Sequence, residues 1–151
     1  MVKKIKDIEY YEAVGRRKES SARVRLYIVS KKDKTVTVKS NVIKQGQIMI
    51  NSKLSEVYFP STVEQNILAK PLVLTGVEDR FAISILVRGG GKSGQLDAII
   101  HGISRALCLI DDTYRPKLKP EGMLTRDPRV RERRKVGTGG KARRQKQSPK
   151  R

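Results

Sequence analysis

A glycine-rich hexapeptide, Gly89 to Gly94, has the residue types needed to bind a phosphate group. Its spacing fits G-x-G-x-x-G, the fingerprint of a dinucleotide-binding turn. That fingerprint also requires a helix followed by a second parallel strand with an acidic residue at its end. Residues 111–116, which follow the expected helix, contain two aspartates and a proline instead of an apolar strand. A P-loop also fails, because Leu86 occupies the position of its first glycine.

Two interpretations of this glycine loop remain open. Free backbone N–H groups, the positive end of a helix dipole and Lys92 would suit a phosphate of a nucleic acid. Alternatively, the glycines allow a tight turn and close packing of the helix. A small kinase or nucleotide hydrolase is disfavoured, because the carboxylates are scattered and Cys108 has no histidine partner in a catalytic motif. We therefore predict that the chain is not an enzyme and uses no cofactor, metal ion or small-molecule substrate.

The charge of the chain indicates a polyanionic partner. The 151 residues include 34 Lys and Arg against 15 Asp and Glu, which gives a net charge of +19. Such an excess is either tolerated as self-repulsion or neutralised by a partner such as a nucleic acid. A membrane partner is not expected, because the sequence contains neither an apolar run of about 20 residues nor a basic amphipathic segment.

Much of this charge lies at the C-terminus. The 27 residues from 125 to 151, which we call the basic extension, contain 12 basic and 2 acidic side chains. Val130, Val136 and Ala142 are its apolar residues, so it cannot bury enough surface to fold alone. It also lacks aromatic residues on which unpaired bases could stack, so its expected targets are phosphates. A solvated tail or a localisation signal is the competing interpretation.

Residues 1–124 have the patterns of one folded α+β body, predicted as a small mixed sheet with helices packed on it. Residues 81–87 are apolar on both faces, which is typical of a central strand. Capping-box spacing at Ser61 to Glu64 predicts a helix that ends near Pro71. The other expected elements are strands at 10–15, 22–28, 35–38 and 47–51, a polar connection at 16–21 and a turn at 31–34.

The strongest helical pattern runs from Gly94 to Ile110, where apolar residues recur every three to four positions. This spacing places His101 and Arg105 on the side opposite the apolar stripe. Ala98 and Gly102 fall on that side too, and their small size would let RNA approach closely. A surface histidine without a role is the alternative for His101.

Several motifs together resemble the family of ribosomal protein nine of the small subunit, in its bacterial form. They are Ala13–Lys18 with Ala22–Arg25, Val87–Gln95, His101–Leu107, Arg115–Lys119, and Leu124–Arg129 with Glu132–Lys135. The resemblance covers nearly the whole chain. Residues 31–46 are longer than the turn usual in that family, which predicts an extra hairpin or a mobile loop.

The resemblance implies a fold with a left-handed β-α-β crossover, shared with the second domain of small-subunit ribosomal protein five. It implies that the body binds ribosomal RNA in the head of the small subunit, beside neighbouring head proteins. The extension would thread through that RNA to the anticodon stem-loop of the peptidyl-site tRNA. The expected location is a ribosome in the cytoplasm, or alternatively in an organelle, and the competing function is a free RNA chaperone or nucleic-acid-coating protein.

The predicted RNA-binding residues fall into three groups. On the body, ribosomal RNA would contact Arg16, Arg17, Lys18, Arg23, Arg25, Lys92, His101 and Arg105. Along the extension it would contact Arg126, Arg129, Arg131, Arg133, Arg134, Lys135, Lys141, Arg143, Arg144 and Lys146. The terminal residues Lys150 and Arg151, which match the Lys-Arg end of the family, would contact the tRNA backbone.

Binding through phosphates predicts a steep dependence on salt. For six to ten neutralised phosphates, the affinity for RNA should fall by about 10³–10⁵ between 50 and 200 mM salt, because bound counterions are released. Fluorescence anisotropy of a labelled ribosomal RNA fragment across this range would measure the slope. An affinity that stays constant would contradict the phosphate interpretation.

Overall fold

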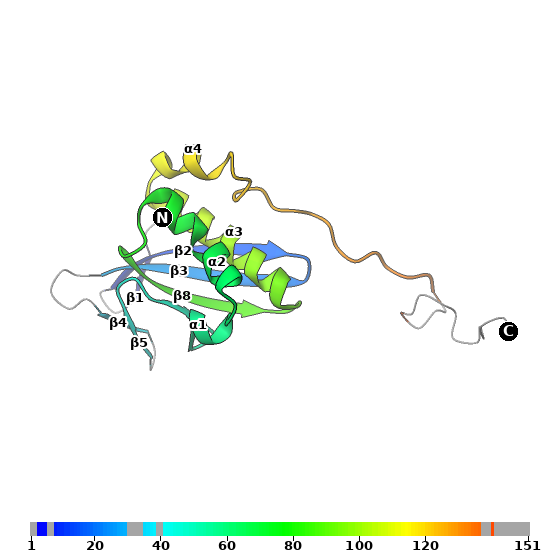
Figure 1. The fold of residues 1–151 in the computed structure, drawn as a ribbon, viewed down its shortest axis with the longest axis horizontal. Helices are drawn as coiled ribbons and strands as arrows, with labels where there is room; N and C mark the ends of the chain where they lie inside the picture. Colours follow the sequence, from blue (N-terminus) through cyan, green and yellow to red (C-terminus); the bar gives the residue numbers. More distant parts are fainter. Residues whose placement is uncertain (1–2, 6–7, 30–34, 39–40, 137–139, 141–151) are drawn as a thin grey trace.

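The computed structural model describes residues 3–5, 8–29, 35–38, 41–136 and 140. A six-stranded sheet has the order β1-β2-β3-β8-β6-β7, and a separate two-stranded sheet consists of β4 and β5. Helices α2 and α3 cover one face of the larger sheet (Figure 1). The strands are β1 (Lys3–Ile5), β2 (Ile8–Arg17), β3 (Ser20–Ile28), β4 (Thr35–Val38), β5 (Asn41–Lys44), β6 (Ile48–Ile50), β7 (Lys53–Leu54) and β8 (Phe81–Arg88). The helices are α1 (Ser55–Tyr58), α2 (Thr62–Thr75), α3 (Lys92–Ile110), the 3-10 turn η1 (Asp112–Tyr114) and α4 (Arg115–Leu118).

Strand β8 is the interior strand that its apolar pattern predicts. It pairs antiparallel with β3 and parallel with β6, so the sheet is mixed. Its residues Phe81, Ile83, Ile85 and Val87 are buried. Because β6 and β8 are parallel neighbours, the chain between them must cross over, and it does so through β7, α1 and α2. The predicted α+β class with a mixed sheet is confirmed.

The β2–β3 hairpin is longer than the sequence indicates. Residues 16–21 are predicted to form a polar connection, but Arg17 pairs with Ser20 and only Lys18 and Glu19 form the turn. Lys18 has a positive φ of 51°, in the left-handed region that such tight turns require. The prediction was wrong because residues 16–21 are all polar, so no alternation of apolar residues marks the strands there, although Ser20 is buried.

Helix α3 packs so closely on β2 and β3 that its own residues Ala98 and Gly102 are buried against the sheet. A Cβ atom added to Gly15 of β2 would overlap the carbonyl oxygen of Ala98 and the backbone nitrogen of Gly102. One added to Gly102 would lie 2.7 Å from Cγ2 of Val24. The prediction that Ala98 and Gly102 face RNA is therefore wrong. Their small size serves the contact between the helix and the sheet.

Helix α2 continues four residues beyond Pro71, although the sequence predicts its end there. A proline inside a helix removes one hydrogen bond. Burial of Leu68 and Leu72 on either side of Pro71 favours continuation. The helix ends at Thr75. Gly76 follows as the C-cap, and its φ of 69° lets Gly76 and Val77 donate hydrogen bonds to the carbonyls of Val73 and Leu72. The helix starts where predicted, but Ser61 makes no side-chain capping hydrogen bond.

Residues 31–46 were predicted to contain an extra hairpin or a mobile loop, and the structure has an extra hairpin there. Strands β4 and β5 pair antiparallel and lie on the face of the large sheet away from the helices (Figure 1). Val36 and Ile43 of the hairpin pack with Tyr10, Tyr27 and Ala82 to form a second, smaller core. The predicted turn at 31–34 lies outside the described residues.

After the turns at residues 119–125, the chain leaves the body as an extended segment (Figure 1). Residues 126–135 have no helix or strand, and Val130 and Val136 are 61% and 87% exposed. Disorder of the extension in the free protein stays a prediction, as does the division into a body at 1–124 and an extension at 125–151. In the described part of the chain, no helix is both long and apolar enough to cross a membrane.

The contact between α3 and β2 predicts a large effect for Gly15→Ala. The new methyl group meets helix backbone that cannot move aside, so we expect the free energy of unfolding to fall by about 1–3 kcal/mol. Urea denaturation would measure it. Gly91→Ser is the control, because no atom lies within 4 Å of a Cβ at Gly91 and serine is favoured at a helix N-cap. Equal stability of both variants would contradict this packing.

Candidate nucleic-acid interface

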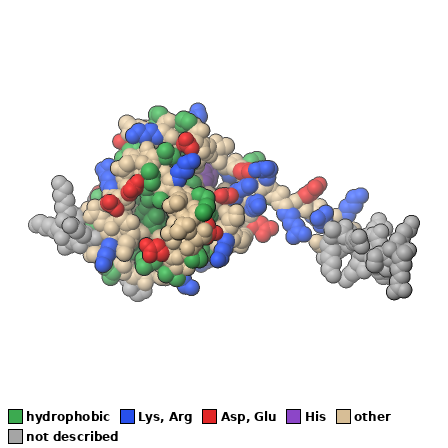
Figure 2. Space-filling model, in the orientation of Figure 1, with side chains coloured by type: hydrophobic (Ala, Val, Ile, Leu, Met, Phe, Trp, Pro, Cys, Tyr) green, Lys and Arg blue, Asp and Glu red, His purple; other side chains and the backbone are tan. Residues whose placement is uncertain are grey.

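The exposed basic side chains gather along the extension. Figure 2 shows Lys and Arg following the segment that projects from the body. In its described part, all six predicted RNA-binding residues are exposed: Arg126, Arg129, Arg131, Arg133, Arg134 and Lys135. The remaining six predicted residues lie outside the described residues: Lys141, Arg143, Arg144, Lys146, Lys150 and Arg151. Their RNA and tRNA contacts stay predictions.

On the body, the predicted residues do not share one surface. Strand register puts Arg23 and Arg25 on the face of the sheet away from α3, because side chains alternate along β3. Arg23 is exposed there. Arg25 instead binds Glu12 at 2.7 Å between Nε and Oε2, and its guanidinium lies 4.9 Å from the centre of the Tyr10 ring. Arg25 therefore stabilises the sheet surface, and any phosphate would compete with Glu12 for it.

His101 and Arg105 lie where α3 crosses the edge of β2. Among the described residues, no strand pairs with the outer side of β2 at this point, because β1 pairs with residues 8–10. The backbone N–H of Arg16 donates to Nδ1 of His101 at 3.4 Å, and Nη1 of Arg105 donates to the carbonyl of Val14. The two side chains thus satisfy backbone groups of an open strand edge. This role was not foreseen from the sequence.

The surroundings of His101 disfavour its charged form and lower its pKa. Burial lowers its pKa below the ordinary value, and the charges of Arg105 and Arg126 lower it further, although a hydrogen bond to the backbone of Leu124 opposes them. A neutral imidazole has one nitrogen that accepts and one that donates. Nδ1 of His101 accepts from the Arg16 N–H, so His101 links α3 to β2 beside the residues that lead into the extension.

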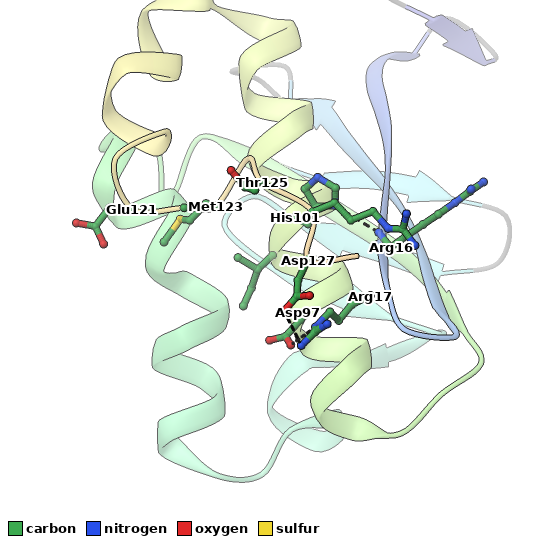
Figure 3. Close-up of a pocket in the computed structure, with 11 residues that line it drawn as sticks. Arg16, Arg17, Asp97, His101, Glu121, Met123, Thr125 and Asp127 are labelled. Carbon is green, nitrogen blue, oxygen red and sulfur yellow. Dashed lines mark hydrogen bonds and ion pairs between the residues drawn. The ribbon is translucent and has the colours of Figure 1, made fainter. Parts of the chain in front are cut away.

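Arg17 is surrounded by acceptors and is 15% exposed. Its Nε lies 3.4 Å from Oδ2 of Asp97, and its Nη2 lies 3.0 Å from Oδ2 of Asp127 (Figure 3). Its Nη1 donates to the carbonyl of Arg129 at 3.3 Å. Asp127 was not among the predicted site residues. An acidic residue two positions before Arg129 is the signal of an Asx turn, and the N–H of Arg129 does donate to Oδ1 of Asp127 at 2.9 Å.

These side chains border a hollow of about 270 Å³ between α3, the end of β2 and residues 121–127 (Figure 3). Arg16, Arg17, His101 and Arg126 line it together with Asp97 and Asp127. The mixture of charges makes it a poor anion site. Among the residues described by the structure, no group of three or more His, Cys, Asp or Glu side chains could hold a metal ion.

The glycine loop packs against the tip of the β2–β3 hairpin. Gly89 and Gly90 have φ values of 75° and 61°, and a Cβ on either would overlap Glu19 or Ser20. Close packing therefore accounts for these two glycines. Lys92 is exposed and lines a hollow together with Lys18 and Arg131. This basic lining would suit a phosphate, and phosphate binding at the glycine loop stays a prediction.

A basic α+β body with an exposed basic extension is typical of proteins that bind polyanions. The family model described as ribosomal protein S9/S16 matches residues 15–151. The small ribosomal subunit protein uS9 of Solidesulfovibrio magneticus is 43% identical over 132 residues, which are 87% of this chain and 90% of that protein. The chain belongs to the ribosomal protein S9/S16 family, so the resemblance found in its motifs is confirmed. Its role is that of a structural protein of the small ribosomal subunit.

The position of His101 predicts a pH dependence of stability. Its pKa is lower in the folded protein than the ordinary value of about 6.5. Between these two values the unfolded chain binds more protons, so the free energy of unfolding should fall as the pH decreases from 7.5 to 5.5. His101 is the single histidine of the chain, so His101→Gln should remove this component. Parallel pH profiles of the two proteins in urea denaturation would contradict the prediction.

Proposed function

We propose that the body binds ribosomal RNA in the head of the small subunit, beside neighbouring head proteins, and that the extension threads through this RNA. The observation that carries the proposal is the concentration of exposed arginines on an extended segment that projects from the body. A segment of this kind can contact phosphates on several RNA helices at once. Membership of a ribosomal family supports RNA as the polyanion.

The body contributes two smaller basic surfaces. Lys18, Lys92 and Arg131 line the hollow beside the glycine loop, where α3 begins and its dipole favours an anion. Arg23 is exposed on the opposite face of the sheet, near the β4–β5 hairpin. These surfaces would fix how the body sits on RNA, while the extension supplies most of the electrostatic free energy of binding.

We further propose that Lys150 and Arg151 contact the backbone of the anticodon stem-loop of the peptidyl-site tRNA. A Lys supplies a point charge and an Arg a planar pair of donors, which suit two neighbouring phosphates. The family also supports a left-handed β6-α2-β8 crossover, as in the second domain of small-subunit ribosomal protein five.

Deletion of Lys150 and Arg151 tests the tRNA contact. The variant should still sediment with the small subunit, because most of the basic residues remain, but binding of tRNA to the peptidyl site or the fidelity of decoding should decrease. Filter binding of tRNA to reconstituted subunits and a misreading reporter would measure both. The combined substitution Lys3→Gln and Lys4→Gln is the control, since it removes the same charge at the other end of the chain.

Two results would contradict the proposal in different ways. Unchanged tRNA affinity and fidelity in the deletion variant would exclude the role of the terminal residues. Sedimentation of the intact protein away from the small-subunit peak would favour a free RNA chaperone or nucleic-acid-coating protein.

A further inference from the structure

The extension does not leave the body directly from α4. Leu118 at the end of α4 is fully buried, and Met123 and Leu124 pack against the main core. The N–H of Met123 donates to the carbonyl of Leu118 at 3.3 Å, which turns the chain back toward α3. His101 of α3 lines the same hollow as Met123 and Thr125 on either side of Leu124. The chain is thus held on the body up to the residue before the extension begins.

Four side chains continue this attachment into the extension. We call Arg17, Asp97, Asp127 and Arg129 the tail clamp. Arg17 binds Asp97 of α3 on one side and Asp127 of the extension on the other, at 3.4 and 3.0 Å. Arg129 closes the arrangement, because its Nη2 lies 2.6 Å from Oδ2 of Asp127 while its own carbonyl accepts from Arg17. Figure 3 shows Arg17, Asp97 and Asp127 converging from three separate segments.

The geometry of Asp127 is that of a structural carboxylate. Both of its oxygens accept hydrogen bonds from Arg129, and Oδ1 also accepts the Arg129 backbone N–H. The side-chain and backbone hydrogen bonds from Arg129 hold the pKa of Asp127 well below its usual range, and the charge of Arg17 adds to this effect. Asp127 is therefore a carboxylate at neutral pH.

Arg17 is poorly placed to bind a phosphate. Its guanidinium is mostly covered, and two carboxylates already neutralise it. A phosphate that reached Arg17 would also face the negative charges of Asp97 and Asp127. An arginine that holds two carboxylates and a carbonyl from different segments has the contacts of a joint between them.

We propose that the tail clamp fixes the direction in which the basic extension leaves the body, and that Arg17 acts as a positioning residue for the extension. An isolated exposed ion pair contributes little, but several charges in one network with a bidentate arginine contribute more. Fixing residues 125–129 beforehand reduces the entropy lost when the extension is ordered on RNA. The inference deepens the proposed function, and its RNA-binding consequence rests on that function.

The substitution Asp127→Asn separates positioning from phosphate binding, because the two roles predict opposite signs. If Arg17 binds phosphate, removing a nearby negative charge should strengthen RNA binding. If the clamp positions the extension, Asp127→Asn should weaken binding of a small-subunit RNA fragment by about threefold to tenfold at constant salt. Glu132→Gln is the matched control, since it removes the same charge from the same segment outside the clamp, and it should bind as tightly as the unmodified protein or tighter.

A distance measurement on the free protein tests the tail clamp without RNA. Spin labels at Val63→Cys and Val136→Cys, in a Cys108→Ser background, report the distance between α2 and the extension. Asp127→Asn and Arg17→Gln should each broaden this distance distribution. The double variant should broaden it by less than the sum of the two, because both substitutions remove the Arg17–Asp127 contact.

The two measurements distinguish failure of this inference from failure of the proposed function. Broadened distances with RNA affinity unchanged in every variant would support the clamp and argue against the RNA-binding role of the extension. Unchanged distances in both single variants, or tighter RNA binding by Asp127→Asn equal to that of Glu132→Gln, would overturn the clamp. Circular dichroism would confirm that each variant is folded.

Discussion

The close approach of helix α3 to strand β2 is the constraint on which the rest of the structure depends. Gly15 and Gly102 allow the two backbones to meet without intervening side chains. Because α3 and β2 lie so close together, His101 and Arg105 reach the backbone at the edge of β2, and Arg17 reaches Asp97. With a larger residue at either glycine, the helix would move outward and separate these partners. The attachment of the extension to the body therefore depends on two core positions, Gly15 and Gly102, that have no side chain.

Sequence patterns were sufficient to predict the position of elements whose buried faces consist of large apolar residues. Strand β8 has apolar residues on both faces and is central, and the stripe on α3 does face the core. The prediction failed where one element is covered on more than one side. Helix α3 packs against β2 and β3 and also against α2, so small residues outside its apolar stripe are buried as well. Helical periodicity indicates one buried face and cannot reveal a second one formed by alanine and glycine.

The sequence was sufficient to predict which basic residues form the candidate site, but not which of them are paired with acidic residues. The exposed arginines of the extension follow directly from the sequence, because a segment so poor in apolar residues cannot bury them. The partners of Arg17 and Arg25 could not be found in this way. Glu12 faces Arg25 only through the register of β2 and β3, and Asp127 meets Arg17 only after the chain has turned back at Met123. Contacts between distant segments require the fold.

The β4–β5 hairpin has a core of its own on the other side of the sheet, formed around Val36, Ile43 and the tilted pair of Tyr10 and Tyr27. The large sheet separates this cluster from the one beneath α2 and α3. The two sides can therefore vary independently: substitutions or changes of length in the hairpin alter one layer without repacking the other. The β4–β5 hairpin could therefore be lengthened, shortened or lost on one side of the sheet without a change in the tail clamp on the other side.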